Sequence, residues 1–283
     1  MIGSGVFGTV YEVDQDKCRK IIPLDHVNIG FREIFGMLLT RDIPNTSKLI
    51  NVEWSDNGLS IIMPKYRINL FDWIKTCPSI EERTRVAKEI VQVILTIHSM
   101  GIVHSDLKLE NIMLTKNNQV VLIDWGFSGF EGTSLYNNTT RLYRSVRLTG
   151  KCVDEIYSLG ILLIEIFSKS IDRYYTPTQY DEIVDFLPIS SKWKSLIKKM
   201  ICRIPKVRPS SQDILNAFDL NITVEQEKYN ILNILEEECL YPEFLKKIVD
   251  KNLIQTMIYN YTKHETYRIF ATNCDLKDLN NII

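Results

Sequence analysis

The sequence lacks the features that define several large classes of protein. Its 283 residues contain no apolar run approaching the roughly 18 residues that a membrane-spanning helix requires. Lys and Arg total 34 against 35 for Asp and Glu, so a net charge of -1 gives no overall basic field for nucleic acid or an anionic membrane. With 45% hydrophobic residues, the chain can still bury a large core. We therefore expect a folded protein whose partners are neither nucleic acid nor membrane.

Paired cysteines and a leader are also lacking. The six cysteines lie far apart without a C-x-x-C pair, and the four histidines show no metal-ligand spacing, which argues against a zinc site or a disulfide framework. The opening M-I-G-S-G has no basic segment followed by an apolar one, so we expect a cytoplasmic protein without a secretory signal. Alanine is scarce and isoleucine abundant, a bias typical of an AT-rich coding genome such as that of a large DNA virus, in which case the cytoplasm is the host's.

The first sixty or so residues predict a small, sheet-dominated lobe. Strand-like segments at residues 9–13, 18–22 and 59–63 are broken by turns, and one helical pattern covers residues 31–39.

From Ser79 onwards the pattern becomes helical. Ser79-Ile80-Glu81-Glu82 fits a capping box, and the apolar spacing that follows predicts one long helix ending at Met100, before Gly101. Two strands, 112–114 and 120–123, are joined by a hairpin-like turn at Asn117-Asn118. Helices are predicted beyond residue 150, with 159–167 buried all round, 193–200 amphipathic and 211–218 closing the lobe.

Residues 220–283 are predicted to form a separate helical C-terminal tail whose role the sequence does not assign. Its apolar positions could pack on the preceding lobe or hold a partner, and we favour packing. These positions are Ile231, Leu232, Leu235, Phe244, Leu245 and Ile248.

A glycine-rich segment at residues 3–10 has the form G-x-G-x-x-G-x-V. Glycines let backbone N–H groups approach phosphate oxygens, because no side chain intervenes. A dinucleotide-binding fingerprint would need a strand before the segment and a helix after it. Strand residues follow here instead, which favours a hairpin closing over phosphates.

Polar residues converge between the long helix and the strand pair. The stretch His104-Ser105-Asp106-Leu107-Lys108-Leu109-Glu110-Asn111 precedes the first strand, and Asp124-Trp125-Gly126 follows the second. Singly, Asp106 could cap a turn, Lys108 could be solvated and Asp124 could end a strand. Together, two carboxylates, an amide and a lysine beside a glycine-rich flap are what phosphoryl transfer needs.

With these motifs in this order, the sequence resembles the eukaryotic protein kinase family over residues 2 to about 219. The resemblance implies an α+β, two-lobed fold with a mostly β N-lobe at 1–66 and a larger helical C-lobe at 67–219. It also implies transfer of the γ-phosphoryl group of ATP, with Mg²⁺, to a protein substrate.

By this resemblance, Lys20 in Cys18-Arg19-Lys20-Ile21 would hold the α and β phosphates, with Lys17 as the alternative, and Glu33 would pair with Lys20. Met63 would be the gatekeeper. Pro64 has no N–H, so adenine recognition would rest on its carbonyl and on backbone groups near Tyr66. The full set of expected nucleotide-binding residues is Ile2, Gly3, Ser4, Gly5, Val6, Phe7, Gly8, Val10, Cys18, Lys20, Glu33, Met63, Pro64 and Tyr66.

The resemblance also assigns the catalytic residues. Asp106 would accept the proton of the substrate hydroxyl, while Asn111 and Asp124 would hold Mg²⁺. Lys108 in D-L-K-x-x-N and Thr140, three residues before Tyr143, resemble a Ser/Thr kinase rather than a tyrosine kinase.

Two departures from the family pattern predict constitutive activity. Ser105 replaces the arginine of H-R-D, which usually receives an activation-loop phosphate, so Ser134 and Thr139 should not be needed as phosphorylation sites. Trp125 replaces the phenylalanine of D-F-G, and its indole N–H could lock this motif inward by hydrogen bonding.

Other departures affect substrate docking more than nucleotide chemistry. Arg147 stands where A-P-E has a glutamate that pairs with an arginine matching Arg208, and two arginines cannot form that bridge. Asp154 and Glu155 are acids that Arg147 could find. Glu155 also occupies the place of a family aspartate, with Asp154 as the alternative. Only two residues precede Gly3, so a loose glycine-rich flap is expected.

Two further functions stay open. A catalytically silent, kinase-like scaffold would account for Ser105 and Arg147 but not for the intact Lys20, Asp106 and Asp124. A small-molecule phosphotransferase of the antibiotic-kinase type shares the H-x-D loop but commonly lacks a lysine at the position of Lys108.

Overall fold

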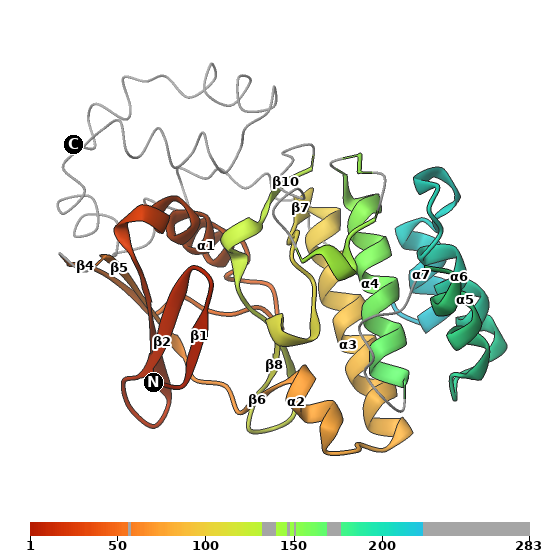
Figure 1. Cartoon of the computed structure of the whole chain (residues 1–283), viewed down its shortest axis with the longest axis horizontal. Coiled ribbons are helices and arrows are strands. Elements are labelled where there is room, and N and C mark those ends of the chain that lie inside the picture. The colour runs from red at the N-terminus through yellow and green to blue at the C-terminus, as the bar shows by residue number, and fades with distance from the viewer. Residues whose placement is uncertain (56–57, 132–139, 146–147, 150, 169–176, 223–283) are drawn as a thin grey trace.

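The computed structural model describes residues 1–55, 58–131, 140–145, 148–149, 151–168 and 177–222, and these form two lobes joined by residues 65–67 (Figure 1). The smaller lobe is built on an antiparallel five-stranded sheet with the order β1-β2-β3-β5-β4. Its strands are β1 (Gly3–Gly5), β2 (Gly8–Glu12), β3 (Lys17–Ile22), β4 (Asn51–Ser55) and β5 (Gly58–Pro64). A short 3-10 turn, η1 (Leu24–His26), leads into its one helix, α1 (Val27–Leu39).

The larger lobe is mainly helical. Its helices are α2 (Leu70–Lys75), α3 (Ile80–Ser99), α4 (Cys152–Phe167), α5 (Pro177–Phe186), α6 (Ser191–Met200) and α7 (Ser211–Phe218). Strands β6 (Ile68–Asn69), β8 (Ile112–Leu114) and β9 (Val120–Leu122) form a small sheet, and β7 (Ile102–Val103) pairs with β10 (Gly129–Phe130). The 3-10 turns are η2 (Leu109–Asn111), η3 (Trp125–Phe127), η5 (Arg141–Tyr143) and η6 (Pro205–Val207).

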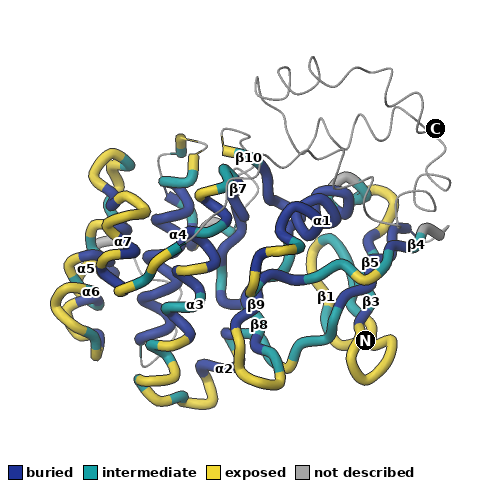
Figure 2. The backbone as a smooth tube through the Cα atoms, turned by 180° about the vertical axis from the view of Figure 1, so that it is seen from behind, coloured by how far each residue is buried: buried dark blue, intermediate teal, exposed yellow. Residues whose placement is uncertain are grey.

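Local sequence signals account for the helices of the larger lobe. Ser79 caps α3, because its hydroxyl accepts the Glu82 amide at 3.2 Å while Glu82 Oε2 accepts the Ser79 amide at 2.8 Å. Helix α4 is buried continuously from Asp154 to Phe167, as its apolar character predicts. In Figure 2 the buried trace runs through α3 and α4 at the centre of this lobe, while exposed residues concentrate on α5, α6 and α7. No helix within the described ranges is both long and apolar enough to span a membrane.

The predicted α+β, two-lobed fold is confirmed, with some boundaries corrected. Helix α1 begins at Val27 rather than residue 31, because Gly30 hides the helical pattern of its first turn. The sequence reasoning missed β4, α2 and the pairing of β7 with β10. Of the predicted tail, only its first residues are described, and Leu220 and Ile222 pack partly buried against the core. Residues 223–283, with Ile231 and the other apolar positions, lie outside the described residues.

Helix α1 approaches its neighbours closely through two glycines. A Cβ added at Gly30 would lie 2.7 Å from Leu59 Cδ2. One at Gly36 would collide with the side chain of Trp125 and lie 2.8 Å from Ser128 Oγ. Glycine in these two places lets α1 rest directly on the β5 side of the sheet and on η3.

Replacing Gly36 by alanine should destabilise the protein although alanine is the better helix former. The added methyl group must push α1 away from Trp125, and overpacking of this kind costs about 1–3 kcal/mol, against a propensity gain of about 1 kcal/mol. Urea denaturation should show a net loss for Gly36→Ala, whereas Gln92→Ala on the exposed side of α3 stays within about 0.5 kcal/mol. A more stable Gly36→Ala protein would contradict this packing.

Candidate active site

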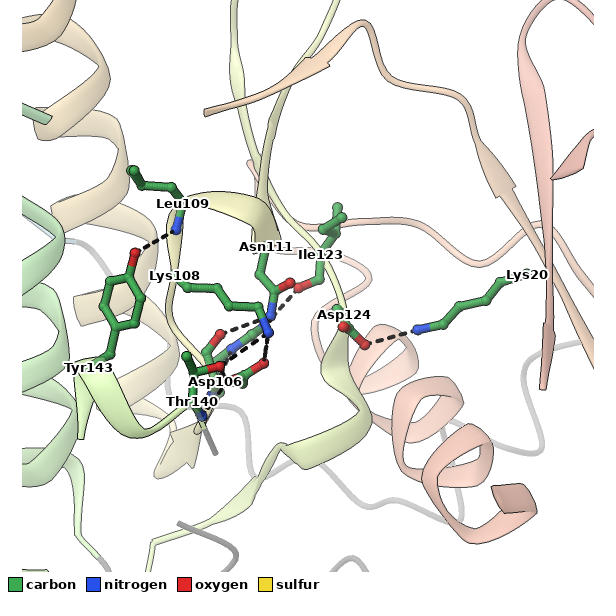
Figure 3. Close-up of polar contacts among 10 residues, drawn as sticks. Lys20, Asp106, Lys108, Leu109, Asn111, Ile123, Asp124, Thr140 and Tyr143 are labelled. Carbon is green, nitrogen blue, oxygen red and sulfur yellow. Dashed lines mark hydrogen bonds and ion pairs between the residues drawn. The ribbon is translucent and has the colours of Figure 1, made fainter. Parts of the chain in front are cut away.

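Lys20 extends from β3 toward the larger lobe and contacts two carboxylates. Its Nζ lies 2.6 Å from Glu33 Oε2 and 2.9 Å from Asp124 Oδ1. Figure 3 shows the contact with Asp124. Glu33 comes from α1 and Asp124 follows β9, so three elements distant in sequence meet at one ammonium group. Lys17, the alternative lysine, is exposed and lies 3.8 Å from Asp14 instead.

Burial and charge act against each other in this triad. Burial disfavours the charged form of Lys20, but Asp124 and Glu33 raise its pKa above the usual value, so Lys20 remains protonated. Burial raises the pKa of Glu33 to about 7 in spite of the attraction of Lys20. Burial would also raise the pKa of Asp124, but Lys20 outweighs it and holds that pKa below its usual value. Asp124 is therefore an anion at neutral pH.

Asp106 lies in the loop after β7, and four donors fix its carboxylate (Figure 3). Its Oδ1 accepts the Thr140 hydroxyl at 2.8 Å and the Thr140 amide at 3.1 Å. Its Oδ2 accepts Lys108 Nζ at 2.5 Å and Asn111 Nδ2 at 3.0 Å. Lys108 also donates to Thr140 Oγ1 at 3.3 Å. The carboxylate is thus oriented and its charge is balanced by one ammonium.

Glu155, buried in α4, holds the backbone that precedes Asp106. Its Oε1 accepts the Ser105 amide at 2.6 Å, and its Oε2 accepts the His104 amide at 3.2 Å and lies 2.7 Å from His98 Nε2. Ser105 has a left-handed φ of 72°, a strained conformation for a residue with a side chain. Burial would raise the pKa of Glu155, but the hydrogen bond from His98 and its other partners keep it below the usual value. Asp154 and Glu155 were the two acids considered for the place of the family aspartate. Glu155 is the one that contacts the loop before Asp106.

Asp154 has a different partner. Its Oδ1 lies 3.5 Å from Arg208 Nη1, and both side chains are inaccessible to solvent. Arg208 also donates to Ser145 Oγ at 2.5 Å and to the Val153 carbonyl at 2.8 Å. By the resemblance, the acid that pairs with this arginine would stand at the position of Arg147. In this chain Asp154 pairs with Arg208 instead. Arg147, Ser134 and Thr139 lie outside the described residues.

Trp125 is fully buried, and its indole N–H donates to Ser47 Oγ at 3.0 Å. Its ring also makes an edge contact with His104, with centroids 5.0 Å apart. The inward hydrogen bond expected for Trp125 is present. The sequence held no signal for Ser47 as its partner, because the two residues are far apart in the chain.

The glycines of the flap differ in what surrounds them. A Cβ at Gly8 would lie 2.7 Å from the Ile21 carbonyl oxygen, so packing in the sheet alone excludes a side chain there. At Gly3 and Gly5 the nearest atoms would be 3.9 and 3.8 Å away, which is ordinary contact. Packing does not explain these two glycines, whereas a phosphate approaching the backbone would. Val10, half-buried, stands opposite Lys20 in the register of β2 and β3.

Phe7 at the tip of the flap contacts two aromatic rings. Its centroid lies 5.3 Å from that of His26 and 5.3 Å from that of Phe127. These contacts argue against the loose flap expected from the sequence. Val6, also at the tip, is exposed, as are Ser4 in β1 and Ile2 before it.

The segment that joins the lobes offers hydrogen-bonding groups to a planar ring. Met63 is buried beside Cys18, whose thiol contacts the Pro64 carbonyl at 3.6 Å. The amides of Lys65 and Arg67 donate to Asp16 and Leu114 at 2.8 and 2.9 Å, but the Tyr66 amide donates to no backbone carbonyl of the described chain. Burial raises the pKa of the Tyr66 phenol to about 12. The adenine contacts expected at the Pro64 carbonyl and near Tyr66 stay a prediction.

Taken together, a glycine-rich flap, a lysine paired with two acidic side chains and an oriented aspartate form a candidate phosphoryl-transfer site. Among the described residues no three His, Cys, Asp or Glu side chains cluster as a metal site of their own. Asn111 and Asp124 could still hold Mg²⁺, which takes few protein ligands when phosphates supply the rest. The Asn111 amide nitrogen donates to the Asp106 carbonyl at 2.9 Å, and no described group donates to its amide oxygen.

Comparison with known proteins agrees with this class. The model of the protein kinase domain matches residues 1–218, and the chain belongs to the protein kinase family. The serine/threonine-protein kinase ppk16 of Schizosaccharomyces pombe is 28% identical over 256 residues, covering 76% of this chain and 36% of that protein. The serine/threonine-protein kinase pim-2 of Danio rerio is 30% identical over 208 residues, covering 66% and 61%. A dual serine/threonine and tyrosine protein kinase of Danio rerio is 30% identical over 192 residues, covering 60% and 21%. The chain thus spans between 21% and 61% of the length of these relatives.

Replacing Glu155 by glutamine should destabilise the protein in a pH-dependent way. Glutamine keeps only one acceptor oxygen for three donors, so we expect a loss of about 2–3 kcal/mol at pH 7. Because the pKa of Glu155 is below its unfolded value of 4.5, the charged form contributes stability above that pH and loses it as the pH falls through the folded pKa.

The test is urea denaturation of wild type, Glu155→Gln and the exposed control Glu81→Gln at pH 7 and below pH 4.5. The difference between wild type and Glu155→Gln should shrink on acidification, and the control should show no such difference. An equal difference at both pH values would show that the charge of Glu155 is not what stabilises the loop.

Proposed function

We propose that this protein is an ATP-dependent serine/threonine protein kinase that is active without phosphorylation of its activation loop. The main support is that Lys20 contacts both Glu33 and Asp124 while Asp106 is already held by Lys108 and Thr140. Two of the relatives named above carry serine/threonine kinase names, which favours hydroxyl groups of protein serine and threonine as acceptors. The dual-specificity relative makes tyrosine the alternative acceptor.

In this proposal the nucleotide lies between the lobes. Gly3 and Gly5 bring backbone amides to the phosphates, Lys20 neutralises the α and β phosphates, and Glu33 orients Lys20. The Pro64 carbonyl and the Tyr66 amide bind adenine against Val10, Cys18 and Met63.

Asp106 binds and orients the acceptor hydroxyl and takes its proton as the new bond forms. Thr140 fixes the direction of the carboxylate, and Lys108 balances negative charge next to the transferred group. Asn111 and Asp124 would hold Mg²⁺, which when bound neutralises charge on the phosphates. The acceptor is thereby placed in line with the group that it receives.

Radiolabelled ATP with generic protein substrates tests the function. Wild type should label protein, with a turnover of about 1–100 per second on a good substrate. Asp106→Asn should lower the rate by about 10²–10⁴-fold, because the general base is lost. Lys20→Met should abolish labelling, whereas Lys17→Met, a matched change on the same strand, should keep it within about twofold, since Lys17 is exposed and remote from Asp124.

Other outcomes select the other functions. Retained nucleotide affinity without any label would favour the catalytically silent scaffold. Label on a small acceptor alone would favour the small-molecule phosphotransferase. Phosphoamino-acid analysis of labelled protein distinguishes serine and threonine from tyrosine.

Activity should not depend on phosphorylation of the activation loop. With Ser105 in place of an arginine, no cation from that position can pair with a phosphate, so Ser134→Ala and Thr139→Ala should each stay within a few fold of wild type. Kinetics on protein treated with phosphatase provide the control. Loss of most activity in either variant would contradict constitutive activity.

A further inference from the structure

Helix α1 lacks the capping and charged residues that stabilise the ends of a helix. Its N-cap residue, His26, makes no capping hydrogen bond, its first turn has no acid and its last turn has no basic side chain. Gly30 and Gly36 each lower helix propensity by about 1 kcal/mol relative to alanine. Because Glu33 lies on α1, the contact between Glu33 and Lys20 depends on contacts that other segments make with this helix.

Lys48 supplies such a contact at the C-terminal end of α1. Its Nζ lies 3.2 Å from the carbonyl oxygen of Thr40, 2.5 Å from that of Arg41 and 2.7 Å from that of Ile43. Thr40 is the C-cap residue of α1, where carbonyl groups carry partial negative charge, and its carbonyl also accepts the Thr46 hydroxyl at 2.7 Å and the Ile43 amide at 3.0 Å. Burial lowers the pKa of Lys48, with Asp42 opposing this, as expected for an ammonium partly withdrawn from water. Lys48 therefore stabilises the end of α1 in place of a basic residue in its last turn.

The segment that carries Lys48 is attached to the larger lobe. The Asn45 amide group donates to the Val120 carbonyl at 2.7 Å, and the Leu122 amide donates to the Asn45 carbonyl at 2.8 Å. The Ser47 amide donates to the Leu122 carbonyl at 2.9 Å, and the Ser47 hydroxyl accepts the Trp125 indole. Residues 45–47, which directly precede Lys48, thus bind β9 and η3, the two elements on either side of Asp124.

A second link joins α1 to the same region. Arg32, buried on α1, donates to the Ser128 carbonyl at 3.0 Å, one residue beyond η3. Gly36 lies directly against Trp125. The helix that carries Glu33 and the turn that follows Asp124 are therefore held together, and Lys48 fixes the end of the helix beyond Gly36.

We propose that Lys48 is a positioning residue, which clamps the C-terminal end of α1 onto the segment anchored to β9 and so keeps Glu33 beside Lys20. The inference rests on the proposed function and explains how that function is maintained without an activating phosphate. Within the described chain, the Lys48 side chain hydrogen-bonds none of the residues placed around the nucleotide; only its backbone hydrogen-bonds the Tyr66 phenol. The side chain acts through the placement of Glu33.

The experiment compares Lys48→Met, Lys48→Arg and a matched control, Lys192→Met. Lys192 performs the same role elsewhere, since its Nζ donates to the Asn216 carbonyl at 2.8 Å and lies 3.4 Å from Asp219 at the end of α7. Both methionine variants remove one ammonium that binds a helix end, but only one of these helices carries Glu33. Hydrogen exchange of the α1 amides in the nucleotide-free proteins is measured first.

Lys48→Met should speed exchange in α1 by about tenfold or more, the scale expected for losing a hydrogen bond to a charged group, while Lys192→Met leaves α1 unchanged. The same variant should raise the KM for ATP and lower kcat, so that kcat/KM falls about tenfold. Lys48→Arg, which keeps donors for the same carbonyls, should restore both readouts to within about threefold.

Wild-type exchange in α1 of a folded Lys48→Met protein would overturn the proposal, whether or not the wild type phosphorylates protein. Global unfolding of Lys48→Met, with Lys192→Met folded, would overturn it too, since Lys48 would then be needed by the whole fold. A wild type that transfers no phosphate, while α1 loosens only in Lys48→Met, would refute the proposed function and leave the clamp intact.

Discussion

The ion pairs of Lys20 with Glu33 and Asp124 set the main constraint on this molecule. Lys20 and Glu33 are largely withdrawn from water and Asp124 is partly so, and a buried charge without a partner destabilises the fold strongly. The three side chains come from β3, from α1 and from the chain after β9. The sheet register, the helix and the junction of the two lobes must all be correct for the contact to exist. Much of the remaining architecture serves to keep these three elements at that distance.

Two buried acids of α4 hold parts of the chain where the sequence departs from the family pattern. Glu155 accepts the backbone amides of both Ser105 and His104 and so fixes the loop that carries Asp106. Arg208 lacks a glutamate at position 147, yet Asp154 and Ser145 contact its guanidinium. In both cases the buried polar groups have partners, as the high free-energy cost of leaving them unsatisfied requires.

Much of the fold could be predicted from sequence because its signals are local. The capping box at Ser79, the apolar α4 and the strands on either side of Asn117 depend on residues that are close in the chain. The motif residues of the site could be found because their spacing is characteristic. Strand β4 and the role of residues 45–48 could not be predicted from the sequence. Lys48 and Ser47 act through contacts that form only in the folded chain. The start of α1 was misplaced for the same reason: Gly30 lowers helix propensity, and packing against Leu59 overrides it.

The buried indole of Trp125 bears on which synthetic molecules can occupy this protein. Its ring is fully enclosed, and its N–H is bonded to Ser47 beneath α1. A compound that pushes residue 125 outward to open space behind Lys20 must break that bond, expose a large aromatic surface and leave the Ser47 hydroxyl without its donor. A compound that leaves Trp125 in place meets none of these penalties. Ligands that bind beside Cys18 and Met63 without displacing Trp125 should therefore be favoured over ligands that displace it.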